Sequence, residues 1–287
     1  MLTSISVITP SFNQGQFIER TIQSVLSQNI ENLEYVIFDG GSNDNTVEIL
    51  KKYDQKLKWV SERDKGQTHA VNKGIMATSG EIIGWLNSDD IYYSGAIEYA
   101  LNFFKHNPDI DIIYGKANYI DKDDQVISPY DTEEWDFDRL LYTCFVCQPA
   151  VFFRRKLIES YGLLDEKLQY CMDYEYWIRL SLKGVKFVYV PELLAGSRLY
   201  AETKTLGSRL KVHREINNML KHVLGYVPER WITNYSITYV EENVTRHRNF
   251  KFKACLFFVY LYSGLKWNKA ITRVMLSNLR IWIFNHG

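Results

Sequence analysis

The sequence predicts an α/β protein with a mainly parallel sheet, helices on both faces of that sheet, and a helical C-terminal extension. Three observations lead to this prediction. Short apolar runs alternate with segments of helical periodicity through the first 115 residues, acidic residues follow two of these runs, and the pattern is helical from about residue 206 onward. Alternating strands and helices are typical of parallel sheets, whose ligands bind beyond the carboxyl ends of the strands.

Five strands and four helices are predicted in the first 115 residues. The apolar runs that predict strands cover residues 5–8, 33–38, 57–60, 81–86 and 110–115. Apolar residues three to four positions apart predict helices near residues 17–26, 46–53, 68–76 and 95–105. Each helix falls between two strands, so we expect it to connect parallel neighbours across one face of the sheet.

Beyond residue 115 this alternation stops. The following segments predict a hairpin at 118–128, a strand at 147–153, helices at 154–161 and 173–182, and a strand at 186–190 that Pro191 ends. The rest of the chain predicts only helices. We therefore divide the protein into a domain of residues 1–205, with halves 1–115 and 116–205, and an extension of residues 206–287.

Charge is unevenly distributed, although 34 basic and 34 acidic residues give a net charge of zero. Residues 245–287 contain eight Lys and Arg and no Asp or Glu, which leaves 26 basic and 34 acidic residues before them. The balanced total gives no reason to expect nucleic-acid binding. The basic tail is also rich in aromatic residues, and that combination suits a membrane–water interface.

Two interpretations of this tail are open. Its apolar centre, residues 254–265, is much shorter than the roughly 20 residues of a spanning helix. The first interpretation is therefore peripheral membrane contact through residues 245–287. The second is a helical hairpin that packs its aromatic rings on the rest of the protein and leaves its basic residues in solvent.

The N-terminal end and the cysteines indicate the compartment. A strand begins at once, without the charged region of a secretory signal, so we expect a cytoplasmic protein, in peripheral contact with the inner face of the cell membrane if the tail binds it. The four cysteines do not form a disulfide framework in a chain of this length. Cys144 and Cys147 are expected in a buried strand.

Acidic residues follow two of the predicted strands. Asp89 and Asp90 come after the strand at 81–86, and Asp39 ends the strand at 33–38, directly before two glycines. Carboxylates bind hard divalent cations such as Mg²⁺ and Mn²⁺, which keep some water and take further ligands from phosphates. Each feature alone is also an ordinary turn sequence. Their order at successive strand ends favours a nucleotide and metal site.

Four motifs strengthen this interpretation. They are Thr9-Pro10-Ser11-Phe12-Asn13, the run from Asp39 to Thr46, Asp64-Lys65-Gly66-Gln67, and Asn87-Ser88-Asp89-Asp90. In this order and spacing, they make residues 3–200 resemble an inverting glycosyltransferase of family 2 with the GT-A fold. The resemblance implies a nucleotide-sugar donor, a divalent cation, and a glycan or lipid-linked acceptor in polysaccharide or lipopolysaccharide synthesis. Residues 1–115 would bind the donor, and residues 116–205 would carry the acceptor site and the base.

The resemblance assigns the donor site to the loops that follow the strands. Asp39 would accept the N–H of the nucleotide base, assisted by Asp64. Asp89 would bind the metal, and Asn87 would contact the ribose at a position where most relatives carry aspartate. The other expected donor contacts are Pro10, Ser11, Asn13, Ser88 and Asp90.

The resemblance also assigns the base that deprotonates the acceptor hydroxyl. Asp173, at the start of a predicted helix, is the first candidate, and capping of that helix is a compatible alternative role. Glu175 is the second candidate. Tyr200 stands where relatives carry a histidine that helps to hold the metal or the diphosphate. The remaining candidate contacts, to the diphosphate or the acceptor, are Gln148, Arg198 and Lys204; Arg198 and Lys204 have a solvated surface position as their alternative.

The carboxylates assigned to the nucleotide base favour UDP as the donor nucleotide and leave GDP and dTDP open. The choice between Mn²⁺ and Mg²⁺ is also open, since both accept carboxylate oxygens. A nucleotidyltransferase is the main alternative, but residues 9–15 contain one glycine and no Lys or Arg, unlike a basic phosphate loop. A non-catalytic sugar- or nucleotide-binding module and a membrane scaffold are further alternatives. Both are disfavoured because the donor motifs and both Asp89 and Asp173 are present.

Overall fold

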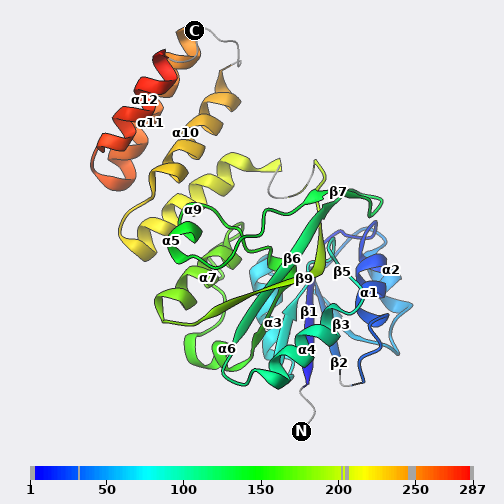
Figure 1. Cartoon of the computed structure of the whole chain (residues 1–287). Coiled ribbons are helices and arrows are strands. Elements are labelled where there is room, and N and C mark those ends of the chain that lie inside the picture. Colours follow the sequence, from blue (N-terminus) through cyan, green and yellow to red (C-terminus); the bar gives the residue numbers. More distant parts are fainter. Residues whose placement is uncertain (1–3, 32, 202, 204–206, 245–249, 285–287) are drawn as a thin grey trace. The chain divides into compact units, whose positions relative to one another are not determined.

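The computed structural model describes the chain except for residues 1–3, 32, 202, 204–206, 245–249 and 285–287. The chain forms two compact units, Met1–Tyr200 and Ala201–Gly287. Among the described residues, all strands belong to the first unit, and the second unit consists of helices (Figure 1).

The first unit contains a nine-stranded sheet with the strand order β3-β2-β1-β4-β8-β6-β9-β5, and β7 pairs with β6 outside this path. Strand β1 is parallel to β2 and β4, β2 to β3, and β6 to β9, whereas β8 is antiparallel to β4 and β6. The strands are β1 Ile5–Ser11, β2 Leu33–Asp39, β3 Lys58–Ser61, β4 Ile82–Trp85, β5 Ile91–Tyr92, β6 Ile112–Ile120, β7 Val126–Pro129, β8 Val151–Arg154 and β9 Phe187–Arg198.

Helices cover both faces of this sheet. Alternate residues of a strand point to opposite faces, so each face has side chains that pack against helices. On one face Val7 belongs to a buried cluster with Ile18 of α1 and Phe104 of α4. On the other face Ile8 meets α3 so closely that a Cβ at Gly74 would lie 2.3 Å from its Cγ2 atom. The helices of this unit are α1 Ile18–Leu26, α2 Thr46–Lys51, α3 Gln67–Met76, α4 Ala96–His106, α5 Phe137–Leu140, α6 Lys156–Tyr161 and α7 Met172–Leu182.

The predicted α/β class and the alternating elements of the first 115 residues are confirmed, with boundaries shifted by a few residues. The hairpin is also confirmed, as β6 and β7. Strand β5 was not predicted, because two residues are too few to show a periodicity. It pairs with the far end of β9.

Three predictions in the second half are wrong. Pro191 does not end its strand: β9 continues to Arg198, because the pairing with β6 skips from Val190 to Leu193 and leaves the proline in a bulge. Residues 148–150 form a 3₁₀ helix with a proline in its first turn, so the strand begins only at Val151. The segment from Cys144 to Cys147 lies in the preceding loop and not in a strand.

The second unit consists of α9 Arg209–Leu224, α10 Glu229–Asn243, α11 Phe250–Asn268 and α12 Arg273–Phe284, which confirms the helical prediction for its described residues. Tyr260 of α11 is buried, and its hydroxyl lies 3.3 Å from both Thr233 Oγ1 of α10 and Asn278 Nδ2 of α12. The Trp267 indole donates to Asn218 of α9 over 2.9 Å. In the part of the chain that the structure describes, no helix is long and apolar enough to cross a bilayer.

Candidate functional site

The ends of β1, β2 and β3 carry a polar turn centred on Asp39. The three strands align here, since Asp39 is paired in register with Ser11 and Ser61. Its buried carboxylate accepts the backbone N–H groups of Gly41 (3.1 Å) and Ser42 (2.8 Å) and the hydroxyl of Ser61 (2.6 Å). Gly41 has φ +82°, a conformation that glycine adopts at little cost. The turn role of Asp39 is therefore confirmed, and its contact with a nucleotide base stays a prediction.

The loops after β1 and β3 adjoin this turn. Asn13 is left-handed at φ +53°, donates its backbone N–H to Ser42 Oγ at 2.7 Å, and accepts the N–H of Asn43 at 2.9 Å. Asp64 lies against Gly40, where an added Cβ would be 2.9 Å from Asp64 Oδ2. The structure thus brings together predicted donor-site residues from three separate motifs.

The first motif contributes differently from what its sequence suggests. Pro10 is buried inside β1, and the Ser11 hydroxyl is buried without a hydrogen-bond partner among the described residues. Phe12, in contrast, is 58% exposed beside the Asp39 turn. In the sequence, an aromatic residue between the polar Ser11 and Asn13 was the signal that Phe12 can contact a planar ligand.

Asn87 is the centre of a hydrogen-bond network behind the acidic loop. Its Oδ1 accepts the side chains of Gln67 (2.7 Å) and Trp85 (3.0 Å), and its Nδ2 donates to Gln148 (2.9 Å) and Asp90 (3.1 Å). Gln148 in turn donates to the Trp85 carbonyl at 2.6 Å. These contacts use the whole capacity of the Asn87 amide. The geometry therefore favours Asn87 and Gln148 as residues that position the loop over direct contacts to ribose and acceptor.

The adjacent aspartates lie in different environments. Asp90 is buried and accepts the backbone N–H of Arg198 at 2.8 Å; burial and the neighbouring charge of Asp89 raise the pKa of Asp90. Asp89 is half-buried and accepts the Tyr200 hydroxyl at 3.0 Å. The Gln14 side chain reaches the same hydroxyl at 3.5 Å. Asp89 is thus the acid that a ligand can reach, and Tyr200 lies beside it.

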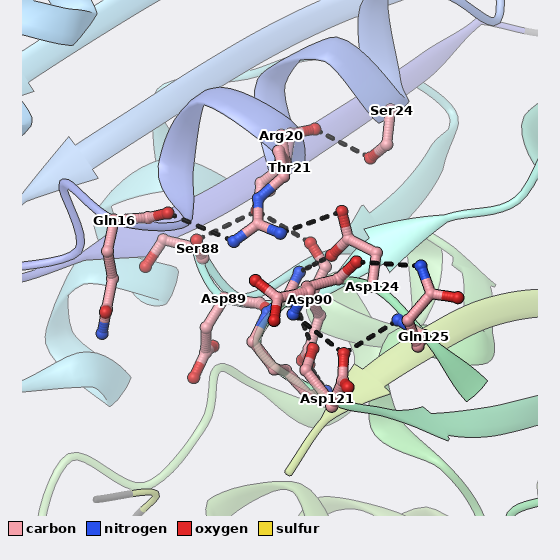
Figure 2. A network of polar contacts seen from close by, with 12 residues as sticks. Gln16, Arg20, Thr21, Ser24, Ser88, Asp89, Asp90, Asp121, Asp124 and Gln125 are labelled. Atoms are coloured by element: carbon pink, nitrogen blue, oxygen red, sulfur yellow. Dashed lines mark hydrogen bonds and ion pairs between the residues drawn. The ribbon is translucent and has the colours of Figure 1, made fainter. Parts of the chain in front are cut away.

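The backbone of the acidic loop is anchored to α1 and β9. Thr21 Oγ1 is within 2.9 Å of the Ser88 carbonyl and 2.8 Å of the Asp90 carbonyl. Arg198 Nε donates to the Asp89 carbonyl at 2.7 Å. Figure 2 shows this network, in which the contacts converge on the loop from elements far apart in the sequence.

Arg198 connects the acidic loop to the turn between β6 and β7. Its side chain is fully buried, pairs with the Asp124 carboxylate, and lies 4.6 Å from the Phe17 ring centroid. Arg20 binds the same carboxylate at 3.1 Å from the other side (Figure 2). The solvated surface position for Arg198 is therefore wrong, because β9 continues to Arg198 and the guanidinium is buried against Asp124. Its internal partners also disfavour a direct phosphate contact.

Asp173 lies in the first turn of α7. The helix begins at Met172 after the N-cap residue Cys171, so the capping alternative for Asp173 is wrong by two positions. Its Oδ1 accepts the backbone N–H of Tyr174 at 2.8 Å. Burial of the carboxyl group raises the pKa of Asp173 to about 6. This carboxylate is oriented by the helix and holds a proton more strongly than an exposed aspartate.

The Cys147 thiol is affected by the charges of both Asp90 and Asp173. Burial raises the pKa of the Cys147 thiol, and the carboxylates of both Asp90 and Asp173 raise it further. Such effects between unscreened groups require proximity. The two carboxylates therefore lie within electrostatic range of one thiol.

Two further candidates have different outcomes. Glu175 is buried, and Arg179 binds both of its oxygens, at 2.8 and 3.1 Å. Arg179 also donates to the Leu163 carbonyl at 2.8 Å. This ion pair disfavours Glu175 as a base. Lys204 lies outside the described residues.

No cluster of three or more His, Cys, Asp and Glu side chains suited to a metal occurs within the described ranges. Asp89 offers one reachable carboxylate, which fits a hard cation that takes most of its ligands from water and a diphosphate.

The mixed α/β sheet with acidic loops at the carboxyl ends of its strands has a GT-A-like fold. The glycosyl transferase family 2 model matches residues 6–162, more than half of the chain. The chain belongs to glycosyl transferase family 2, which confirms the resemblance of its motifs and decides against a nucleotidyltransferase.

Three similar proteins illustrate this membership. An uncharacterized glycosyltransferase of Rickettsia typhi is 30% identical over 211 residues, which cover 68% of this chain and 64%, less than two thirds, of that relative. Staphylococcus aureus TarS 1–349 in complex with UDP-GlcNAc shares the fold with a TM-score of 0.61 at 15% identity, over 91% of this chain and 81% of TarS. The mannosyltransferase PcManGT from Pyrobaculum calidifontis, in complex with GDP-Man and Mn²⁺, gives 0.61 at 16% identity, over 96% and 78%.

Proposed function

We propose that this protein is an inverting glycosyltransferase that moves a sugar from a nucleoside-diphosphate sugar, UDP foremost, to a hydroxyl of a glycan or lipid-linked acceptor. We place this reaction in polysaccharide or lipopolysaccharide synthesis. The observation that carries the proposal is the half-buried Asp89 carboxylate, fixed at the end of β4 by Tyr200 and backed by Arg198. Family membership and the nucleotide-sugar complexes of TarS and PcManGT support it.

The nucleoside would bind at the ends of β1 to β3. There Asp64 presents a carboxylate, Phe12 presents an exposed ring, and the buried Asp39 holds the turn beside them, so hydrogen bonding and stacking can act on one planar base. Asn13 holds the loops after β1 and β2 together. These residues bind and orient the donor and take no part in bond breaking.

The diphosphate would lie at Asp89. A divalent cation, Mn²⁺ or Mg²⁺, held there would supply positive charge that offsets the charge of the leaving diphosphate. Tyr200 fixes one carboxylate oxygen of Asp89, and Arg198 holds its backbone, so the acid is oriented before the donor binds. Such preorganisation removes a cost that binding would otherwise carry.

Asp173 is proposed as the general base. The acceptor oxygen bonds to the anomeric carbon from the face opposite the diphosphate, the bond from that carbon to the phosphate oxygen breaks, and the hydroxyl proton passes to Asp173. A pKa of about 6 leaves this carboxylate ionised at neutral pH yet more basic than an ordinary aspartate. Its first-turn position in α7 fixes its direction.

Nucleotide release tests this function without knowledge of the acceptor. Purified protein is incubated with UDP-, GDP- and dTDP-sugars, with Mn²⁺ or with EDTA, and free nucleotide is measured. We expect slow, metal-dependent release from one nucleotide class, because water can replace the acceptor. Nucleotide binding without release from any donor would favour a non-catalytic binding module, and absence of both release and binding for every donor would contradict the proposed function.

The Arg198 contact gives a prediction for a residue far from the donor. Asp124→Asn removes the counter-charge of a buried guanidinium that holds the Asp89 backbone. We expect metal-dependent nucleotide affinity to fall by about 10-fold, because the buried Arg198 guanidinium loses a charged partner and then holds the Asp89 carbonyl less firmly. Calorimetry measures the affinity, and thermal unfolding measures the stability.

Asp123→Asn is the matched control, because Asp123 is exposed in the same turn. It should leave both quantities unchanged. Equal nucleotide affinity in the D124N and wild-type proteins would show that the turn does not position the acidic loop.

A further inference from the structure

Helix α11 carries apolar side chains on two opposite sides. At 100° per residue, Phe258, Tyr262 and Leu265 fall within an arc of about 60°. These three side chains are 68%, 66% and 50% exposed. Tyr260 and Trp267, on the opposite side, are buried against neighbouring helices. The buried residues on the inner side explain how α11 packs against its neighbouring helices. That packing does not explain the exposed apolar residues on the outer side.

Helix α12 packs beside α11 and carries exposed apolar residues of its own. It approaches α11 so closely that a Cβ at Gly264 would lie 2.4 Å from the Met275 Cε atom. On α12, Val274 and Leu276 are 53% and 50% exposed, but they lie about 160° apart around the helix axis and therefore do not form one face. We call the exposed Phe258, Tyr262 and Leu265 the α11 outer face.

Basic side chains surround the apolar residues of these two helices. Exposed cations accompany the outer face near both ends of α11 and along α12: Lys251, Lys266, Lys269, Arg273 and Arg280. Residues 245–287 contain no Asp or Glu, so no acid within this segment offsets these charges. Lysine and arginine can lay their alkyl stems on apolar surface while their charged ends reach outward.

The charge also discriminates between two occupants of this face. A symmetric dimer through the outer face would place the same basic surface of two copies against each other. Like charges repel in such an interface. A surface of anionic lipid headgroups over an apolar interior complements both features, since it attracts the cations and accepts the aromatic and aliphatic side chains at headgroup depth.

We propose that the α11 outer face docks the protein on an anionic membrane surface, as a peripheral contact that does not span the bilayer. This surface belongs to the second unit and does not depend on the proposed sugar transfer. It assigns the C-terminal basic segment to lipid binding and explains why exposed aromatic residues and unbalanced cations occur on the same helices.

Flotation of the full chain with vesicles tests this proposal. Vesicles of phosphatidylcholine with 30% phosphatidylglycerol are compared with pure phosphatidylcholine, at low and high salt. We expect binding to the anionic vesicles, weakened at least 10-fold by high salt or by the neutral lipid. The variant F258S/Y262S/L265S should weaken that binding at least 10-fold, because these side chains are exposed and their loss leaves the helical core intact.

The matched control is V126S/I127S, which removes an equally exposed apolar pair from β7 in the first unit (57% and 53% exposed). It should bind anionic vesicles like the wild type, and circular dichroism should show both variants folded. Wild-type protein that ignores anionic vesicles, or a triple variant that binds them normally, would overturn the proposal. So would a wild-type dimer that the triple variant converts to a monomer in light scattering, which would assign the face to a second copy.

Discussion

Replacing Asp173 by asparagine is expected to lower the rate of sugar transfer by at least about 100-fold, the lower range for loss of a general base. Nucleotide affinity should stay within about twofold of the wild type, because the donor residues lie on other loops. The amide retains an oxygen for the Tyr174 N–H, so α7 should keep its first turn. Initial rates with donor and acceptor, together with calorimetry of the nucleotide, measure the two quantities.

Asp138→Asn is the matched control, since Asp138 is an exposed aspartate in the first turn of another helix, α5. It should leave transfer unchanged. Loss of nucleotide binding in the D173N protein would contradict the base assignment, because a base for the acceptor contributes little to donor affinity.

The raised pKa of Asp173 also predicts a pH dependence. A base acts when ionised, so transfer should decline as the pH falls through about 6 and level off above it. The folded protein disfavours the ionised form of Asp173, and this lowers the stability of the fold above pH 6. The loss of stability shrinks as the pH falls, and it disappears below the pKa that the carboxyl group has in the unfolded chain. The D173N protein should therefore be at least as stable as the wild type at pH 8, and its residual activity should lose the step near pH 6.

Replacing Asp89 by asparagine is expected to remove metal-dependent nucleotide binding, with an affinity loss of about 100-fold in the presence of Mn²⁺. The amide keeps the size of the carboxylate and an acceptor for the Tyr200 hydroxyl, but it loses the charge that attracts a hard cation. Calorimetric titration with and without Mn²⁺ measures the change.

The exposed Asp123→Asn variant again serves as the control, because it removes the same charge without touching the acidic loop. Residual nucleotide binding by D89N protein should be the same with Mn²⁺ and with EDTA. Full metal-dependent affinity in that variant would place the cation elsewhere.

The alternation of apolar runs and helical periods was enough to predict the first half of the sheet, because each of those elements is long enough to show its own period. Pro191 misled the prediction because a bulge depends on the partner strand, β6, which lies about 75 residues earlier in the chain. The two-residue β5 has no pattern of its own, since its pairing with the end of β9 alone defines it.

The candidate site shows the same division between local and distant information. The motifs around Asp39 and Asp89 could be recognised from residue type and order. The roles of Arg198 and Asn87 depend on partners as far as 109 residues away, and those partners favour a supporting role for a candidate phosphate ligand and for a candidate ribose ligand. Neither burial of a guanidinium nor saturation of an amide can be read from a linear sequence.

The central claim is that Asp89 and the turn around Asp39 form one metal-dependent nucleotide site. Calorimetric titration of UDP, GDP and dTDP into the full chain, each with Mn²⁺ and with EDTA, tests it most directly. We expect saturable binding of one nucleotide, UDP foremost, that requires the metal and is lost in the D89N protein. Binding of no nucleotide under either condition, or binding that ignores both the metal and Asp89, would contradict it.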